Sequence, residues 1–216
     1  MIISKHKKES PGKNFSDKAR LKKVSERKIA MEIALAIMAG IALSATSGFR
    51  VFVPFLVLSI ANLAGLLDLN QSFAWIGTYP ALATFGVATL VEILAYFIPW
   101  VDNALTAISA PASVVAGTIL TYALVGDLAP GLAWIISIIG GGGASLVTRA
   151  ISGIVHAGST AASGGTANPA VSLAESAGTV VMSILALVAP FIVILLLLLL
   201  ISWAIKTYKR LIAKKQ

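Results

Sequence analysis

The sequence predicts an all-α protein, a polytopic membrane helical bundle of about six crossings plus two re-entrant half-helices, arranged as two inverted repeats. Hydrophobic residues make up 57% of the chain and charged residues only 12%. Apolar runs such as PFIVILLLLLLISWAI, residues 190–205, are too long and too uniform for helices of a soluble core. The basic residues gather at the two ends of the chain, and an apolar segment that ends on arginine occurs twice. Together these features predict a membrane bundle built from a duplicated unit.

The apolar segments define one transmembrane domain. They fall at residues 30–47, 50–66, 80–98, 104–126, 131–147, 149–158, 169–188 and 190–206. We expect a single domain over 30–206, with repeat one at 30–126 and repeat two at 131–206. The flanking stretches, 1–29 and 207–216, hold too few apolar residues to build a second core, and we interpret both as basic cytoplasmic tails.

The placement of the basic residues predicts the orientation. Ten of the 17 lysines and arginines lie in residues 1–30 and five more lie in 206–215, which leaves Arg50 and Arg149 between them. Positive charge beside membrane helices marks the cytoplasmic side, so we expect both termini in the cytoplasm and an even number of full crossings. No aromatic residues alternate with the lysines of the N-terminal tail. We therefore expect this tail to bind anionic lipid headgroups and not nucleic acid.

Two parts of the chain match each other in order. Residues 33–50, IALAIMAGIALSATSGFR, lie over residues 132–149, LAWIISIIGGGGASLVTR. Further along, residues 79–99 lie over residues 168–190, and each of these segments has a proline at both ends and one glutamate between them. Chance matches are common among Ala, Leu and Gly, but the shared order Arg, Pro, Glu, Pro is harder to produce that way. The pattern indicates an internal duplication.

The short segment 149–158 decides the predicted topology. As a helix it would rise about 15 Å, against a hydrocarbon core of about 30 Å. Its counterpart 50–66 begins on a charge and contains Pro54, which suits a half-membrane helix better than a lipid-facing span. If both are re-entrant, each copy contributes an odd number of crossings, so the second copy enters the membrane inverted. Whether 169–206 forms two crossings or one kinked helix is left open, because LVAPFIV contains no polar turn.

Arg50 and Arg149 are the candidate cations of a binding site. An ionised side chain inside a membrane costs several kcal/mol unless it faces the bundle interior. At the start of a half-helix, free N–H groups, the helix dipole and a guanidinium all favour an anion. The planar fork of arginine suits phosphate or carboxylate. Glu92 and Glu175 complete the set, as groups that tune the site or exchange protons with it.

A structural role is the competing interpretation of the same charges. In this interpretation Arg50 and Arg149 pair with Glu92 and Glu175, and the four residues do no more than hold the bundle together. His156 lies seven residues after Arg149, on the same helix face. It could act as a proton relay, but we expect a hydrogen-bonded structural histidine.

Two smaller motifs have a packing interpretation. The run GGGG, residues 140–143, indicates either a close backbone approach or a break in the helix. Asp102 and Asn103 lie just past Pro99, which we take as the end of a helix, and we interpret them as a cap for the next helix.

The sequence does not support an enzyme. It contains no cysteine, which excludes disulfides and thiolate metal sites. It also lacks histidines and carboxylates at metal-ligand spacing and has no GxSxG elbow. We therefore expect no catalytic activity, no metal and no cofactor.

The stretches SGFRVFVP, EILAYFIPWVD and TRAISG through NPAVSLAE resemble an uncharacterised family of small bacterial integral membrane proteins, that of domain of unknown function four-one-two-six. The likeness covers most of residues 30–190. Its marks are Gly48, Arg50, Pro54, Glu92, Pro99, Asp102, Pro169, Ser172 and Glu175. Where family members often carry a second acidic residue and a lysine, this chain has Ser176 and Phe97. The resemblance implies a multi-pass protein of the bacterial cytoplasmic (inner) membrane and brings no established activity.

The string GFRVFVP, residues 48–54, is also similar to the arginine-and-proline motif on a re-entrant helix of the DedA family. Members of that family are implicated in moving phosphorylated lipid carriers and phospholipids across membranes. This similarity implies a re-entrant helix that faces an anion.

We expect a secondary transporter or lipid-headgroup translocator for an anionic substrate. The candidate substrate-binding residues are Arg50, Arg149, Glu92, Glu175, Ser172 and Asp102. The expected partners are membrane lipids and an anionic small molecule or lipid headgroup, and a homodimer is left open. The alternative is a membrane scaffold that transports nothing, whose buried charges are structural and whose basic tails bind anionic lipid or a partner.

Overall fold

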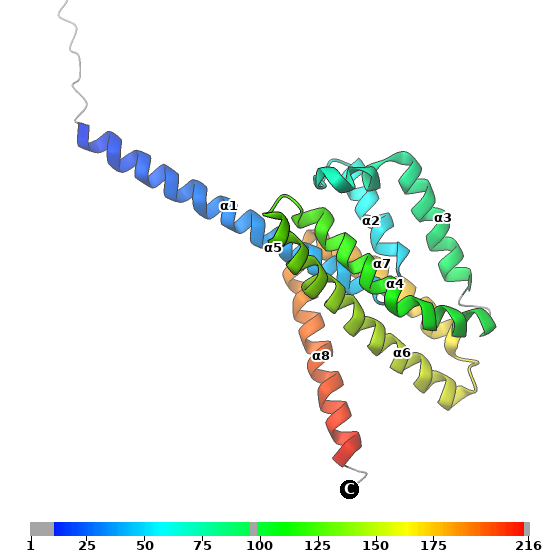
Figure 1. Cartoon of the computed structure of the whole chain (residues 1–216). Coiled ribbons are helices and arrows are strands. Elements are labelled where there is room, and N and C mark those ends of the chain that lie inside the picture. The colour runs from blue at the N-terminus through cyan, green and yellow to red at the C-terminus, as the bar shows by residue number, and fades with distance from the viewer. Residues whose placement is uncertain (1–10, 96–98, 214–216) are drawn as a thin grey trace, which may run out of the picture. The chain divides into compact units, whose positions relative to one another are not determined.

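The computed structural model describes residues 11–95 and 99–213, and within these ranges the chain is helical and has no strands (Figure 1). The helices are α1 (Pro11–Ser47), α2 (Phe52–Leu63), η1 (Gln71–Gly77), α3 (Tyr79–Ala95), α4 (Pro99–Val125), α5 (Pro130–Ile135), η2 (Ile136–Gly142), α6 (Gly143–Ser163), α7 (Asn168–Val188) and α8 (Pro190–Ala213). Element η1 is a 3-10 helix and η2 is a π-helix. The predicted all-α class is confirmed.

The chain divides into two compact units, Met1–Leu35 and Ala36–Gln216. In the first unit every side chain whose burial is described is exposed. The pairs Lys22–Glu26 and Lys28–Glu32 lie one helical turn apart, with N–O distances of 4.0 and 3.8 Å. Exposed pairs of this kind contribute about 0.3–0.5 kcal/mol each. They support the helix locally.

Within the described residues, four helical stretches are long and apolar enough to cross a membrane. They are Arg20–Ser47, Ile108–Val125, Pro130–Ser163 and Asn168–Val188. A fifth is present if η1 and α3, which are bent by 65° relative to each other, form one broken span. Large hydrophobic side chains such as Val87, Leu90 and Ile139 are exposed on these helices. Such helices are those of an integral membrane protein. The count of six crossings stays a prediction.

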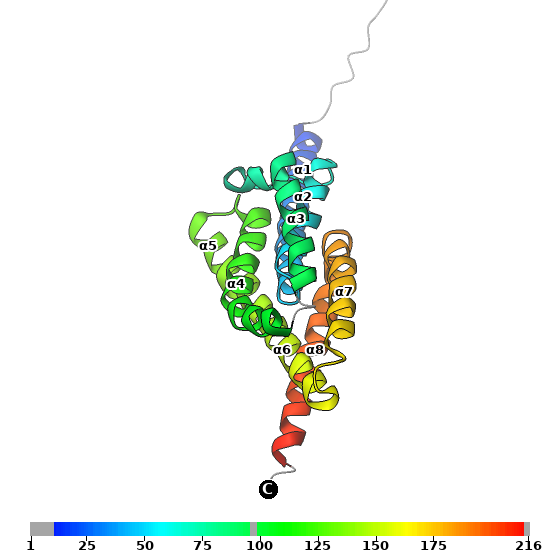
Figure 2. The ribbon, with the colours of Figure 1, turned by 90° about the vertical axis from the view of Figure 1, so that its right-hand side faces the viewer.

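In the second unit, α2 packs against α3 and α7, and α4 packs against η2 and α6 (Figures 1 and 2). Hydroxyl groups join the end of α1 to this core. Ser44 donates to the carbonyl of Gly117 at 2.6 Å, and Thr148 donates to the carbonyl of Ala45 at 2.6 Å. Small side chains therefore let α1, α4 and α6 approach closely while their polar groups remain satisfied.

The GGGG run does not break the helix. The π-helix η2 contains its first three glycines and leads directly into α6. A Cβ at Gly141 would overlap the hydroxyl of Thr121, and a Cβ at Gly117 would overlap the hydroxyl of Ser145. The glycines thus permit the close approach of α4 to η2 and α6, which is one of the two interpretations made from the sequence.

The predicted half-helix at 50–66 is present as α2. It has 12 residues and rises about 18 Å, which is well short of a hydrocarbon core of about 30 Å. The chain leaves the α2 helix at Gly65, whose φ of 69° favours glycine. Arg50 lies two residues before the first residue of α2, close to the helix start at which it was expected.

The prediction that residues 149–158 form a second re-entrant segment is wrong. These residues lie inside α6, and α5, η2 and α6 form one apolar helical stretch of 34 residues, Pro130–Ser163. No proline occurs between Pro130 and Pro169, so nothing in the sequence forces the helix to stop near residue 149. Arg149 is therefore in the middle of a helix and not at an N-terminus. This removes one of the two arguments for inverted repeats.

The stretch 169–206 forms two helices. Helix α7 ends at Val188, and Ala189 leaves the helical conformation with φ −145° and ψ 66°. Pro190 follows and begins α8, as a proline disfavours the helical conformation of the residue before it. Figure 2 shows α8 running back in the opposite sense to α7. A single residue makes the turn.

The close approach at Gly117 can be tested by adding one methyl group. Gly117→Ala would place a Cβ against the hydroxyl of Ser145 and 2.7 Å from the carbonyl oxygen of Gly141. We expect the variant to lose about 1–3 kcal/mol of stability by overpacking, measured by thermal unfolding in detergent. The matched control is Gly86→Ala in α3, where nothing lies within 4 Å of the added Cβ. It should be neutral or more stable by up to about 1 kcal/mol. Equal effects would contradict the packing account.

Candidate functional site

The side chain of Arg50 is fully buried, with 0% exposure. Its Nε donates to the hydroxyl of Ser176 at 2.9 Å, and its Nη2 donates to the carbonyl of Ser172 at 2.9 Å. Both acceptors are on α7, which packs against α2. The prediction that this arginine faces the bundle interior is confirmed. Its guanidinium fork fixes the start of α2 to α7.

The N-terminus of α2 holds a carboxylate that belongs to the protein itself. Glu92 of α3 accepts hydrogen bonds from the backbone N–H of Val51 at 2.8 Å and of Phe52 at 3.1 Å. These N–H groups have no partner within the helix, because the first turn of any helix leaves its donors free. Val51, at the N-cap position, provides no side-chain cap, because its apolar side chain has no acceptor atom. The carboxylate of Glu92 thus lies where the sequence predicted an anion, and the binding of a substrate anion there stays a prediction.

Arg149 lies near this carboxylate although it starts no helix. Its side chain is 5% exposed, and both Arg149 and Arg50 are close enough to Glu92 to attract it electrostatically. The two arginines and the glutamate therefore form one buried charge cluster. That the two arginines together bind one substrate stays a prediction.

Glu175 of α7 has different partners. It accepts a hydrogen bond from the hydroxyl of Ser152 at 2.7 Å, and its other oxygen lies 3.1 Å from Nε2 of His156. Both partners are on α6, and His156 is 8% exposed. His156 is the hydrogen-bonded histidine that we expected. Its Glu175 partner was not foreseen, although the spacing of Ser152 and His156, one turn apart, places both on one helix face.

The two glutamates play parallel parts in the two halves of the chain. Each one binds the segment that directly follows the arginine of its own half. After Arg50 a new helix begins, so Glu92 can accept from backbone N–H groups. After Arg149 the helix continues and its backbone donors are already used, so Glu175 binds side chains instead.

Ser172 and Asp102 complete the predicted set. Ser172 is 2% exposed, and its hydroxyl has no hydrogen-bond partner among the described residues. Its carbonyl accepts from Arg50 and also from the hydroxyl of Ser176, at 2.7 Å. The side chain of Asp102 lies outside the described part of the structure. Its interpretation as a cap is wrong, because α4 begins at Pro99 and Asp102 lies within the helix.

Ser176 is a hydrogen-bond partner of Arg50 that sequence reasoning missed. We noted it only as a place where related chains carry an acid. It lies four residues after Ser172, on the same face of α7, and that spacing is the signal that could have identified it.

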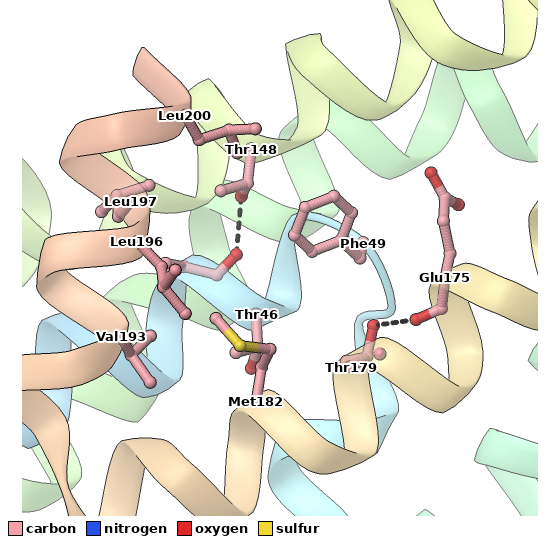
Figure 3. Close-up of a pocket in the computed structure, with 12 residues that line it drawn as sticks. Thr46, Phe49, Thr148, Glu175, Thr179, Met182, Val193, Leu196, Leu197 and Leu200 are labelled. Carbon is pink, nitrogen blue, oxygen red and sulfur yellow. Dashed lines mark hydrogen bonds between the residues drawn. The ribbon is translucent and has the colours of Figure 1, made fainter. Parts of the chain in front are cut away.

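Two cavities end at the glutamates. The first, of about 320 Å³, lies among α7, α8, α6 and the end of α1, with Leu196, Leu197 and Leu200 on one side and Glu175 at its edge (Figure 3). The second, of about 760 Å³, lies between α3, α4 and the start of α2, and includes Glu92. Each cavity therefore combines mainly apolar walls with one carboxylate.

The site has no described metal centre. Among the residues that the structure describes, no group of three His, Asp or Glu side chains could hold a metal ion.

The fold and the site define an integral membrane protein with a buried cluster of arginines and glutamates. The chain belongs to the family of domain of unknown function DUF4126, whose family model matches residues 37–210. No curated protein and no solved structure matches the chain, so the similarity of GFRVFVP to the DedA family has no support beyond those residues.

The capping role of Glu92 can be measured by removing its charge. Glu92→Gln keeps the size of the side chain but has one oxygen, so it cannot accept from both Val51 and Phe52. We expect a loss of about 1–3 kcal/mol in thermal unfolding, the cost of leaving a buried donor unsatisfied. Glu26→Gln, at an exposed pair in α1, is the control and should change stability by less than about 0.5 kcal/mol. A loss no greater than in the control would contradict the role of the cap.

Proposed function

We propose that the protein is a membrane transporter for a substrate with an anionic group, and that this group binds at the N-terminus of α2. The observation that carries the proposal is the pair of hydrogen bonds from Val51 and Phe52 to the carboxylate of Glu92. A position that already holds one carboxylate has the donors that a substrate carboxylate or phosphate needs. Glu92 then acts as a resident anion that the substrate displaces.

The surrounding residues fit an exchange of anions. Arg50 and Arg149 supply positive charge in surroundings of low dielectric, where electrostatic attraction is strong. The hydroxyl of Ser172, which has no described partner, is a further donor beside Arg50. When Glu92 takes up a proton it loses the charge that holds it at the helix. A proton bound by Glu92 therefore favours an anion at α2, which couples substrate and proton.

A scaffold without transport is the second candidate. It is favoured by the complete burial of Arg50 and by its two hydrogen bonds to α7, which fix α2 in place. In this case Glu92 only caps α2, and the buried charges only hold the helices of the bundle together.

The inverted-repeat arrangement and the orientation also belong to this proposal. Support for the repeats comes from the parallel partners of Glu92 and Glu175 and from the contact of Ser47 with Ser145, at 2.8 Å, between nearly equivalent positions of the two matched segments. The basic residues at both ends support cytoplasmic termini in a bacterial inner membrane.

The orientation predicts the reactivity of single cysteines. The chain contains no cysteine, so one can be introduced at residue 8 or residue 212 without removing others. In intact cells, a membrane-impermeant thiol reagent should label neither position, and it should label both once the membrane is opened. A cysteine at position 66, in an internal turn where Leu66 is 78% exposed, is the comparison. Labelling of this position in intact cells would place that turn on the outer side of the membrane. Labelling of residue 212 in intact cells would rule out an even number of crossings.

The anion site can be tested with inorganic phosphate as the probe. In Glu92→Gln the resident charge is gone, so phosphate should raise the unfolding temperature more than in the unchanged protein. At a hundredfold excess over Kd the gain in free energy of unfolding is up to about 2.7 kcal/mol. Arg50→Ala combined with Glu92→Gln should lose this response. Chloride at the same ionic strength is the control for screening.

The scaffold gives a different result in the same experiment. There, the double variant regains the stability lost on Arg50→Ala alone, because Glu92 is no longer a buried carboxylate that lacks the charge of Arg50. Phosphate then acts no more strongly than chloride in any variant. That pair of results would make us abandon the anion site.

A further inference from the structure

The cavity at Glu92 and the anion position at α2 are parts of one site. Val51 and Phe52, which donate to the carboxylate, and Glu92, which accepts, all line the cavity of about 760 Å³. A molecule in this cavity therefore lies against the three residues that form the anion position. The ligand's shape and polarity can be inferred from the rest of the wall.

The rest of the wall is apolar. Of the twelve described residues that line the cavity, nine are apolar, and the polar exceptions are Thr84, Glu92 and Ser109. The apolar members are Val51, Phe52, Ala83, Val87, Ala88, Val91, Ala95, Ile108 and Ala112. A hydrated ion gains nothing from such walls, whereas an acyl chain packs against them by dispersion contacts and loses no hydration.

We propose that this cavity binds an anionic lipid, with an acyl chain between α3 and α4 and its phosphate or carboxylate headgroup at the N–H groups of Val51 and Phe52 in place of Glu92. The inference rests on the proposed function and specifies its substrate as a lipid. Charge complementarity supports the headgroup's position, because Arg50 and Arg149 lie within electrostatic reach of the carboxylate that now occupies it.

The other cavities fit this ligand less well. The cavity of about 320 Å³ contains Glu175, whose oxygens are held by side chains of α6. It thus offers no pair of backbone donors for a headgroup. The cavity of about 500 Å³ between α2, α3 and α7 has Thr89 as its only polar lining residue among those described. It has no charged group, and so it serves as the control site.

Two exposed positions give a matched pair of variants. Val87 lines the cavity at Glu92 and is 62% exposed, and Ile60 lines the control cavity and is 50% exposed. Tryptophan at either position fills part of its cavity without entering the packed core. The proteins are incorporated into vesicles of phosphatidylcholine with a minor share of phosphatidate, extracted, and analysed for retained lipid by native mass spectrometry.

We expect phosphatidate to be retained in preference to phosphatidylcholine, and Val87→Trp to reduce that retention about tenfold, equivalent to about 1.4 kcal/mol. Ile60→Trp should retain as much as the unchanged protein.

Three results would overturn the inference. Equal retention of phosphatidate and phosphatidylcholine would show that the protein retains membrane lipid without recognising the headgroup. Equal effects of Val87→Trp and Ile60→Trp would show that the cavity at Glu92 is not the binding place. A change in oligomeric mass with Val87→Trp, without a change in lipid, would show a second copy of the chain there. If phosphate still stabilises Glu92→Gln in these cases, the proposed function stands, and it fails separately if phosphate has no effect.

Discussion

The contact between Glu92 and the first N–H groups of α2 is the interaction on which the site depends. The chain leaves α1 at Ser47 and starts a new helix at Phe52 inside an apolar bundle. The N–H groups freed there and the carboxylate of Glu92 would each be costly to bury alone. Together they satisfy each other, and Arg50 and Arg149 add electrostatic attraction to the carboxylate. The start of α2 and the position of α3 beside it follow from this arrangement.

The two halves of the chain use the same residue types for different local structures. An arginine followed by a segment that binds a glutamate occurs in both. In the first half the helix is interrupted, and backbone groups become available to the glutamate. In the second half the helix is continuous, and Ser152 and His156 provide the partners. A continuous helix keeps its donors for itself, so only the first half presents an anion position made of backbone.

Much of the fold could be predicted from apolar length and from charge placement. The all-helical class, the short helix after Arg50 and the burial of that arginine follow from the cost of charge and of unpaired backbone in an apolar environment. The continuity of α6 through Arg149 could not be predicted in this way. A segment of ten residues can be interpreted as a separate half-helix only if a helix break, such as a proline, divides it from the preceding helix. Here the glycines of η2 continue the helix by π-turns.

The side-chain partners were less predictable than the helices. The sequence indicated that four charged residues belong together, but pairing depends on the rotation of each helix about its axis. Ser176 shows this limit, because its hydroxyl meets Arg50 only through the packing of α2 on α7. Single-sequence patterns give the face of a helix and not the neighbour that the face meets.

The hydroxyl contacts around the end of α1 have a consequence for how this protein behaves outside a membrane. Ser44, Ser47, Ser145 and Thr148 join α1, α4 and α6 through neutral hydrogen bonds of 2.6–2.8 Å. Neutral bonds are not screened by added salt, whereas exposed charge pairs are. The hydrogen bonds of the central helix crossing should accordingly hold at any ionic strength.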